Sequence, residues 1–378
     1  MRVWTAGRTL ALVLGSAAIA PQALAQAASS LTVYGLADVA VELSDAGRGS
    51  FWRVVSGGNL GSRLGFRGSE DLGGGLSAVF RIEAGINLDD GSAAQGGRAW
   101  GREASVGLAS RDAGTLVAGR VPMPYNLALV AVDAFGWGGS GGQIAIGRND
   151  PALRPLLALG LAARLDNALR YTSPSWNGLS LQGMASLGEG SSSIGRGAGF
   201  AARYTQGAVD AVVSAQRVNG AGNLGASGSV QGLVVGGSVQ LGASRVFAGL
   251  TEERNSCSTG CSGLPRVTGA TTVRFRLLNL GLRQPLGAAF TGIAQYTRVQ
   301  DRSAYAAATG ARDAHWLALG GEYTLSKRSM IYGSVGTVGN HNGSNYVLGS
   351  GSALQAAGAI GAGNPRATTT QLGVRHSF

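Results

Sequence analysis

Residues 62–83 constrain the fold more than any other part of this chain. Two runs of alternating apolar and polar residues flank an acidic, glycine-rich turn at 70–75, which is the pattern of a β-hairpin. The apolar face carries Leu64, Phe66, Phe80 and Ile82, and the opposite face carries Arg63, Arg67, Arg81 and Glu83. Guanidinium groups repeated on the polar face indicate a wet interior. This arrangement, apolar toward lipid and polar toward a channel, is typical of transmembrane β-barrels.

The composition agrees with a large barrel whose interior is not filled by a hydrophobic core. Of the 378 residues, 64 are glycine and only 13% are charged. The glycines lie between strand-like runs and at their ends, which suits tight turns and strands that bend around a cylinder. Counting these runs predicts an all-β fold: one transmembrane antiparallel β-barrel of about sixteen strands. No linker divides residues 26–378, so we expect a single domain.

The first 25 residues have the pattern of a signal peptide. Arg2 and Arg8 form a basic segment, residues 10–20 an apolar one, and residues 23–25 an A-x-A cleavage site. A transmembrane anchor is disfavoured because the apolar run is short. An exported chain without helical spans can still cross a membrane as a closed barrel.

Short turns and long loops alternate along the chain, as they do at the two rims of an outer-membrane barrel. Short turns are predicted at 70–75, 110–114, 173–178, 206–207, 242–243, 284–287 and 326–328. Long loops are predicted near 44–50, 89–98, 121–165, 189–196, 218–228, 253–268, 299–311 and 339–366. The third of these, called loop 3 below, is too long for an ordinary connection, and its apolar content predicts a functional loop folded into the lumen. Its part at 151–165 could include a short helix.

The chain ends in an alternating strand, residues 370–378, whose last residue is Phe378. A terminal phenylalanine after such a strand resembles the assembly signal of outer-membrane proteins. Seven aromatic residues near strand ends suit the girdles at a membrane interface, although ordinary packing explains any single one equally well. They are Trp52, Trp100, Tyr171, Trp176, Trp316, Tyr323 and Tyr332.

The formal charge of +11 comes almost entirely from arginine, because Lys327 is the only lysine. Arginine stays charged in any plausible environment, and its donor fork suits carboxylate and phosphate. The arginines are dispersed, often one per strand, rather than clustered with aromatic residues. This distribution argues against nucleic-acid binding.

Several blocks of the sequence, in order, resemble the general porins of the Gram-negative outer membrane, of the beta-proteobacterial type. They are residues 31–38, 62–83, 97–108, 114–120, 167–174, 323–329 and 373–378. The resemblance covers most of the chain after residue 25. It implies a sixteen-stranded homotrimer with a water-filled pore in each subunit, and a third loop that narrows each pore.

Strand parity predicts that eight arginines face away from lipid. The energetics agree, since a charge on the outer face at the bilayer midplane costs about 2–4 kcal/mol. They are Arg63, Arg67, Arg81, Arg170, Arg203, Arg274, Arg276 and Arg375. Such a ladder of cations would line the pore and draw anions through it. Alternatively, many of these arginines pair with acidic residues on neighbouring strands.

Arg102 and Arg120 share parity with apolar neighbours, yet the resembling family carries arginine at both positions. We therefore expect a bulge, or a strand end just before them, to turn both inward. Opposite charges near the constriction should come from loop 3, with Asp133 and Asp150 as the candidates. Opposed charges would create a transverse field across the opening, which is one means of ion selection.

No catalytic or metal-binding pattern is present in the sequence. Cys257 and Cys261 form a C-x3-C pair, for which the exported context favours a disulfide over zinc, and a free pair is the further alternative. The three histidines have no metal-ligand spacing, and neither a nucleophile elbow nor a phosphate-binding loop occurs. We expect no enzyme activity, no metal and no cofactor.

The leading functional hypothesis is a channel for passive diffusion of small hydrophilic solutes, with a preference for anions. Two alternatives stay open: a channel specific for one organic anion, and a closed barrel that serves as an anchor or adhesin. The expected partners are two further copies of the chain, outer-membrane lipid and lipopolysaccharide, the outer-membrane assembly machinery, and small anionic or neutral solutes.

Overall fold

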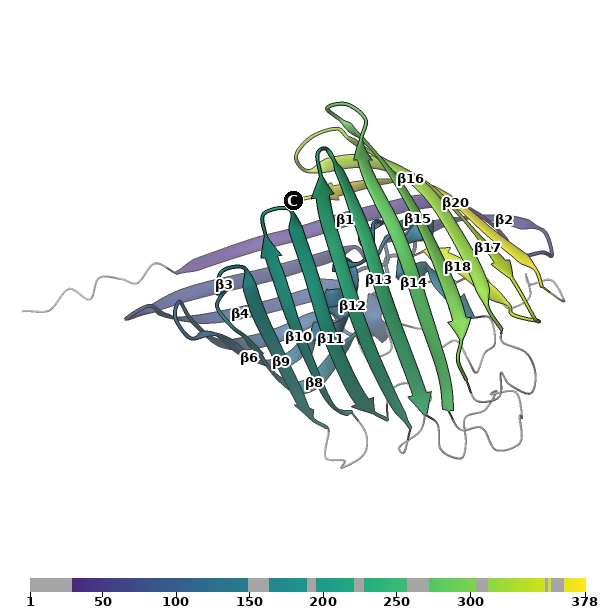
Figure 1. Ribbon diagram of the computed structural model, residues 1–378. Coiled ribbons are helices and arrows are strands. Elements are labelled where there is room, and N and C mark those ends of the chain that lie inside the picture. Colours follow the sequence, from purple (N-terminus) through teal and green to yellow (C-terminus); the bar gives the residue numbers. More distant parts are fainter. Residues whose placement is uncertain are drawn as a thin grey trace, which may run out of the picture.

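The computed structural model describes residues 29–148, 163–188, 195–220, 228–256, 272–303, 312–350, 353–354 and 364–378. Within these ranges, strands form nearly all of the regular structure (Figure 1). Four sequence predictions lie outside the described residues: the signal peptide at 1–25, Asp150, Cys257 and Cys261. Among the helices of the described ranges, none is long and apolar enough to cross a membrane.

The wall of the molecule is one antiparallel sheet in which neighbours in the chain are neighbours in space. Its strands are β1 (Ser30–Asp45), β2 (Ser50–Ser56), β3 (Arg63–Gly73), β4 (Leu76–Gly85), β5 (Glu103–Ser110), β6 (Gly114–Pro122), β8 (Arg164–Thr172), β9 (Leu179–Leu187), β10 (Arg196–Gln206), β11 (Val209–Asn219), β12 (Ser229–Leu241), β13 (Ser244–Ser256), β14 (Thr272–Pro285), β15 (Phe290–Asp301), β16 (Ala314–Thr324), β17 (Ser329–Asn340) and β20 (Arg366–Ser377). Because β2 and β3 pair with the two halves of β1, they are one interrupted strand. The wall therefore has sixteen strands, which confirms the prediction.

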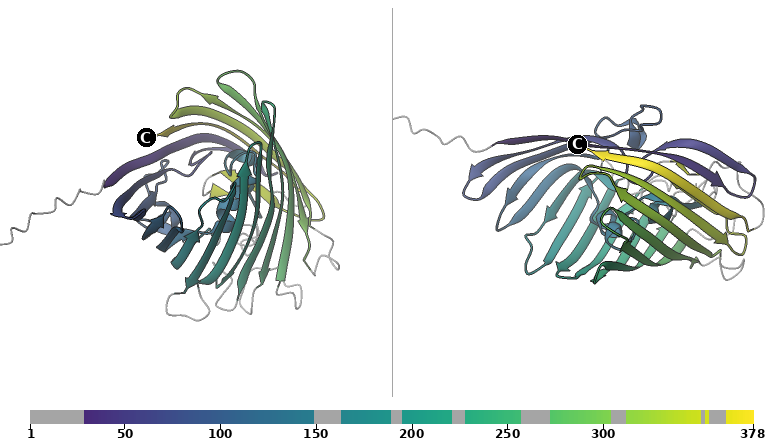
Figure 2. Two further views of the ribbon diagram at one scale, coloured as in Figure 1. Left: turned by 60° about the vertical axis from the view of Figure 1, so that its left-hand side comes forward. Right: turned by 90° about the horizontal axis from the view of Figure 1, so that it is seen from above.

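The sheet closes where β1 meets β20, from Leu36 opposite Ser377 to Asp45 opposite Thr368. The pairing extends to the last residue: the Phe378 N–H donates to the Gly35 carbonyl at 3.1 Å, and the Gly35 N–H donates to the Phe378 carbonyl at 3.0 Å. Figure 2 shows the purple β1 beside the yellow β20. Closure leaves no strand edge unpaired, which a sheet in lipid requires.

The two rims of the barrel differ in the length of their connections, as predicted. The β3–β4 turn needs its glycines, because Gly73, Gly74 and Gly75 all have positive φ, at 85°, 61° and 79°. This turn belongs to the turn-bearing rim, and the opposite rim carries the long loops. One predicted long loop is wrong, since only residues 46–49 connect β1 to β2.

Alternation along each strand sorts side chains between the two faces of the wall. In β16, Leu317 and Leu319 are half exposed on the outer face, whereas Trp316 and Ala318 are buried on the inner one. Five of the seven aromatic residues predicted to form girdles are exposed: Trp52, Trp100, Tyr171, Trp176 and Tyr323. The prediction is wrong for Trp316 and Tyr332, which are buried because their strand position turns them inward.

Loop 3 folds into the barrel and packs against the inner face of the wall (Figure 2). It begins with α2 (Pro124–Ala131), which has proline in its first turn and contacts β9, β10, β11 and β12. The short elements inside and above the barrel are α1 (Ala94–Gly97), η1 (Gly139–Gly141), η2 (Gln143–Ala145), β7 (Ile146–Arg148), β18 (Tyr346–Ser350) and β19 (Ala353–Leu354). The short helix suggested within 151–165 stays a prediction, because most of that range lies outside the described residues.

Glycines of the wall make room for this loop. A Cβ atom at Gly232 would lie 2.6 Å from the Tyr125 ring, and one at Gly249 would lie 2.7 Å from the Val132 side chain. Since real Cβ atoms essentially never approach so closely, the loop lies directly on the backbone of β12 and β13. Loop 3 and the inner wall together form the apolar core of the protein, and the remaining interior is left to polar side chains.

Candidate functional site

Two cavities inside the barrel are lined by arginine. The turn-side cavity, of about 520 Å³, lies nearer the short turns, and its charged lining consists of Arg67, Arg81, Arg170 and Glu103. The loop-side cavity, of about 420 Å³, is lined by Arg63, Arg102 and Arg164 together with Trp137 of loop 3. Arg63 and Arg67 are therefore divided between the two cavities, although one strand carries both.

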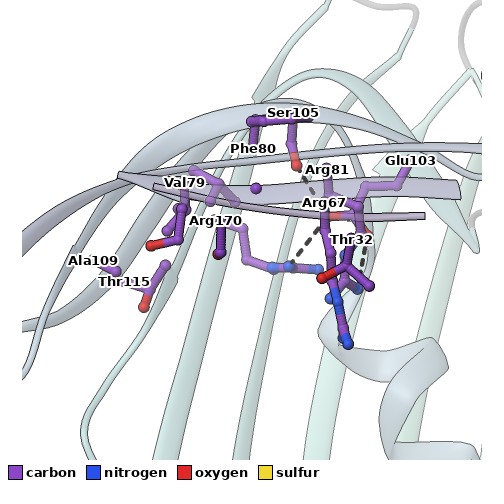
Figure 3. A pocket seen from close by; sticks show the side chains of 14 residues that line it. Thr32, Arg67, Val79, Phe80, Arg81, Glu103, Ser105, Ala109, Thr115 and Arg170 are labelled. Atoms are coloured by element: carbon purple, nitrogen blue, oxygen red, sulfur yellow. Dashed lines mark hydrogen bonds and ion pairs between the residues drawn. The ribbon is translucent and has the colours of Figure 1, made fainter. Parts of the chain in front are cut away.

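The turn-side cavity is lined by three guanidinium groups and one carboxylate, and two of the three guanidinium groups contact that carboxylate (Figure 3). Arg81 lies 3.5 Å and Arg170 lies 3.7 Å from Glu103, which also accepts a hydrogen bond from Ser105 Oγ at 3.0 Å. Arg67 lies directly opposite Arg81 and stacks over the Tyr34 ring at 5.4 Å. Among the described residues, Arg67 has no carboxylate within ion-pair distance. The cavity therefore carries an excess of two positive charges.

The loop-side cavity is lined by three arginines, two of which share one carboxylate, Glu83, that does not itself line the cavity. Arg102 Nε donates to Glu83 at 2.5 Å, and Arg63 lies 3.9 Å from the same carboxylate. Arg164 Nε donates to the Arg102 carbonyl at 2.8 Å, and in the described part of the chain it has no carboxylate partner. Glu83 further accepts from Tyr34 Oη at 2.9 Å, so this carboxylate is held in place rather than free to follow an ion.

Arg102 and Arg120 reach the interior side of the wall by the two irregularities that were expected. Arg102 precedes β5 and is thus released from the alternation of that strand. Arg120 lies where the β6–β8 register shifts, between Gly119 and Val121. Its guanidinium donates to Asp166 at 2.6 Å, and Arg98 donates to the same carboxylate at 2.8 Å. Arg120 lines neither of the two cavities.

Polar side chains of the inner wall hold loop 3 in place. Asn279 Nδ2 donates to the Val132 carbonyl, and Gln295 Oε1 accepts from the Ala134 N–H at 2.8 Å. Further along the loop, Ser334 Oγ accepts from the Ser140 N–H at 3.0 Å. These bonds reach β14, β15 and β17, so the loop is fixed to the wall opposite the arginine-rich strands.

Asp133 does not belong to either cavity, which corrects its assignment from the sequence. Its side chain is buried, and its two oxygens accept from the Phe135 N–H at 2.9 Å and the Gln143 N–H at 2.7 Å. Burial raises the pKa of this carboxyl to about 6. Asp133 therefore organises the backbone of loop 3, and the carboxylates that face the arginines are Glu83 and Glu103.

Sequence reasoning also placed Arg274 and Arg276 on the wrong face. In β14, Phe275 and Leu277 are fully buried, whereas the two arginines share the exposed parity of Leu278 and Leu280. Both lie near the loop-bearing end of β14, beyond the apolar band, where a charge on the outer face costs little. Arg203 and Arg375 face inward as predicted; Arg203 pairs with Asp210 at 2.6 Å, and Arg375 donates to Asn59.

These features define a class of protein: a closed transmembrane β-barrel with a narrowed, positively charged interior. The sequence matches the Gram-negative porin family over residues 9–343. It is 29% identical to outer membrane porin protein 32 of Delftia acidovorans over an alignment that covers 97% of this chain and 99% of that protein. An outer membrane porin protein of Bordetella pertussis is 36% identical over 41% of this chain, and the alignment spans only 42% of that protein.

A solved structure has the same fold. The anion-selective porin from Comamonas acidovorans aligns with a TM-score of 0.73 over 93% of this chain and 100% of that chain, at 24% identity. The chain belongs to the Gram-negative porin family, and it is a channel-forming β-barrel of the outer membrane.

Proposed function

We propose that this porin lets small hydrophilic solutes diffuse through the outer membrane and prefers anions. The observation that carries the proposal is the excess of positive charge at the two cavities: six arginines line them, and these pair with only two carboxylates, Glu103 and Glu83. In a confined passage such an excess raises the local concentration of anions and lowers that of cations. The Comamonas relative is an anion-selective porin, which supports the same preference.

Recording from purified protein in planar lipid bilayers tests this proposal. We expect stable open steps and a zero-current potential in a salt gradient that has the sign of anion preference. A cation-preferring potential would refute the selectivity. Block of the ionic current by one organic anion at low concentration would support the specific channel instead, and an absence of open steps would support a closed anchor.

The partners are a further part of the proposal. We infer a homotrimer within outer-membrane lipid and lipopolysaccharide, reached after cleavage of residues 1–25 and insertion by the outer-membrane assembly machinery. OmpT of Vibrio cholerae, which shares this fold at a TM-score of 0.63, has been solved in a trimer form, and this supports the trimer. Phe378 would be the assembly signal, and its half-exposed ring on the outer face is available for recognition. The proposed disulfide between Cys257 and Cys261 and the pore role of Asp150 rest on the sequence.

A further inference from the structure

Two histidines that lie far apart in the sequence meet on the outer face of the barrel. His315 of β16 shares its outward parity with the exposed Leu317 and Leu319, and His341 is the first residue after β17 and is exposed as well. Their ring centres are 5.3 Å apart, and the ring planes are nearly perpendicular, at 88°. Because both lie at the loop-bearing rim, we call His315 and His341 the rim histidine pair.

The register of β16 and β17 brings this pair together. Gly339 lies directly opposite His315, so His341, two residues further on, is a diagonal neighbour on the same face. Diagonal neighbours are about 7–8 Å apart, within reach of aromatic side chains. The His341 N–H donates to the Asp313 carbonyl at 3.1 Å and to Ser344 Oγ at 2.8 Å, which holds its backbone beside β16. Spacing along the sequence could not show this pair, because it forms across two strands.

A tyrosine of the neighbouring strand orients one ring of the pair. Tyr296 of β15 stacks on His315 with ring centres 5.9 Å apart, and its Oη shares a hydrogen bond with His315 Nδ1. In the tautomer in which Nδ1–H donates to this oxygen, Nε2 keeps a free lone pair. Metal-binding histidines almost always donate their second ring N–H to such a partner, which fixes the tautomer and the ring orientation.

The spacing of the rim histidine pair suits one transition-metal ion. Two imidazoles bound to a tetrahedral ion at about 2.0–2.1 Å have ring centres about 5 Å apart, near the observed 5.3 Å. Both side chains are exposed, so a rotation that turns their nitrogens toward one ion disturbs no packed core. Within the described ranges, no group of three or more histidine, cysteine, aspartate or glutamate residues has the arrangement of a metal site. Water would therefore complete the coordination.

We propose that the rim histidine pair binds a divalent transition-metal ion, Zn²⁺, Ni²⁺ or Cu²⁺, with Tyr296 as a positioning residue. Imidazole suits these ions, whereas Mg²⁺ and Ca²⁺ prefer oxygen ligands. Because His341 begins the segment between β17 and β18, the bound ion would tie the start of that segment to the wall. One neighbouring charge opposes binding, since Arg298 lies directly opposite His315.

Calorimetric titration of the untagged protein in detergent with each of these ions tests the proposal. We expect one ion per chain, bound most tightly for Cu²⁺, and no binding of Mg²⁺. His315→Gln and His341→Gln should each weaken Cu²⁺ binding by about tenfold or more, because a single imidazole remains. The matched control is His376→Gln, which removes the histidine beside Ser329 at the turn-bearing rim and should bind as wild type does. Equal affinity of wild type and His341→Gln would overturn the proposal.

Two further variants test the surroundings of the ion while both histidines remain. Tyr296→Phe keeps the stacked ring but loses the hydrogen bond to Nδ1, so Cu²⁺ affinity should fall about tenfold. Arg298→Gln removes the opposing charge and should tighten binding about threefold at low salt. A merely structural role of these two residues would change neither affinity, and that result would refute the placement of the ion at the pair.

The spectrum of bound Cu²⁺ reports the ligands directly. Electron paramagnetic resonance of the wild-type protein should show coupling to two imidazole nitrogens, and His341→Gln should show coupling to one. Both side chains are exposed, so the variants should fold, and an unchanged Tm without metal checks this. Coupling to a single imidazole in the wild type would also overturn the proposal.

Discussion

The selectivity of this porin should depend on two arginines that face each other across one pair of strands. Arg67 and Arg81 are direct cross-strand neighbours in the turn-side cavity. In Arg67→Gln/Arg81→Gln, the remaining Arg170 keeps its contact with Glu103 at 3.7 Å, so the excess of two positive charges falls to zero. Both arginines point into the lumen rather than a packed core, and the barrel should fold normally.

The size of the effect follows from the size of the cavity. A sphere of the observed volume has a radius of about 5 Å, and at that distance in water one guanidinium attracts an anion by about 0.8 kcal/mol. At about 0.1 M salt, screening leaves roughly 1 kcal/mol for the two arginines together, or about a fivefold change in anion concentration. At about 1 M salt the same two charges contribute roughly 0.3 kcal/mol, which is less than twofold.

Zero-current potentials in a salt gradient measure this effect directly. The double variant should lose at least about fivefold in its anion-to-cation permeability ratio near 0.1 M salt, and most of the difference should vanish near 1 M. Arg203→Gln/Asp210→Asn is the matched control, because it removes an inward-facing ion pair at 2.6 Å without changing the net charge. It should leave the permeability ratio unchanged.

A folded double variant with unchanged anion preference at low salt would refute the reasoning. In that case the field in the turn-side cavity would not control ion passage, and Arg67 and Arg81 would serve the structure of the wall. A change of equal size at low and high salt would also contradict it, because only a screened electrostatic effect depends on ionic strength in the expected way.

Three further predictions concern assembly, loop 3 and pH. Deletion of Phe378 removes two hydrogen bonds to Gly35 at the closing seam, so the yield of heat-modifiable trimers in the membrane should fall before conductance changes; a normal yield would contradict this. In Gly138→Val, the added Cβ would lie 1.8 Å from the Asn59 carbonyl, so the tip of loop 3 should be displaced and single-channel conductance should rise, with an unchanged conductance as the opposing result. The pKa of the Asp133 carboxyl is about 6 in the folded loop, against 3.8 when the group is free, so the folded loop favours the protonated form. The free energy that stabilises the folded loop should therefore be largest below about pH 4, fall by about 3 kcal/mol as the pH rises to about 6, and stay constant at higher pH. Hydrogen exchange at the Gln143 amide, corrected for intrinsic rates, should lose protection over that interval, and Asp133→Asn should abolish the trend.

Much of the fold could be predicted because period-2 patterning carries the relevant physics. In the hairpin of β3 and β4, the alternation of Leu64 and Phe66 with Arg63 and Arg67 already separates lipid from water. A strand faces only two ways, so parity determines both faces once one is known. The same rule located the C-terminal strand and the strand count.

The functional site was harder to predict from the sequence, because it depends on where strands are interrupted and on the depth of each residue in the membrane. Arg164 falls within the range predicted as loop 3, and its place beside Arg102 follows from β8 beginning at that residue. Asp133 was predicted to be a carboxylate of the constriction, but its two oxygens accept hydrogen bonds from two backbone N–H groups of its own loop. For Arg274 the inward prediction was wrong, because it shares its exposed parity with Leu278 and Leu280 near the loop-bearing end of β14, where an outward charge costs little.

The interruption between β2 and β3 ties the seam of the barrel to its constriction. Residues 57–62 leave the wall there, and Asp38 of β1 accepts hydrogen bonds from the Leu60 N–H at 2.8 Å and from Tyr332 Oη at 2.5 Å. On its other side this segment offers the Gly58 carbonyl to the Gly139 N–H of loop 3 at 2.7 Å. The first strand of the chain, a strand near its end and the tip of the loop thus meet in one small network. If the barrel closes while loop 3 is misplaced, part of this hydrogen-bond network is lost. Closure of the wall and correct placement of the loop that narrows the pore therefore stabilise each other.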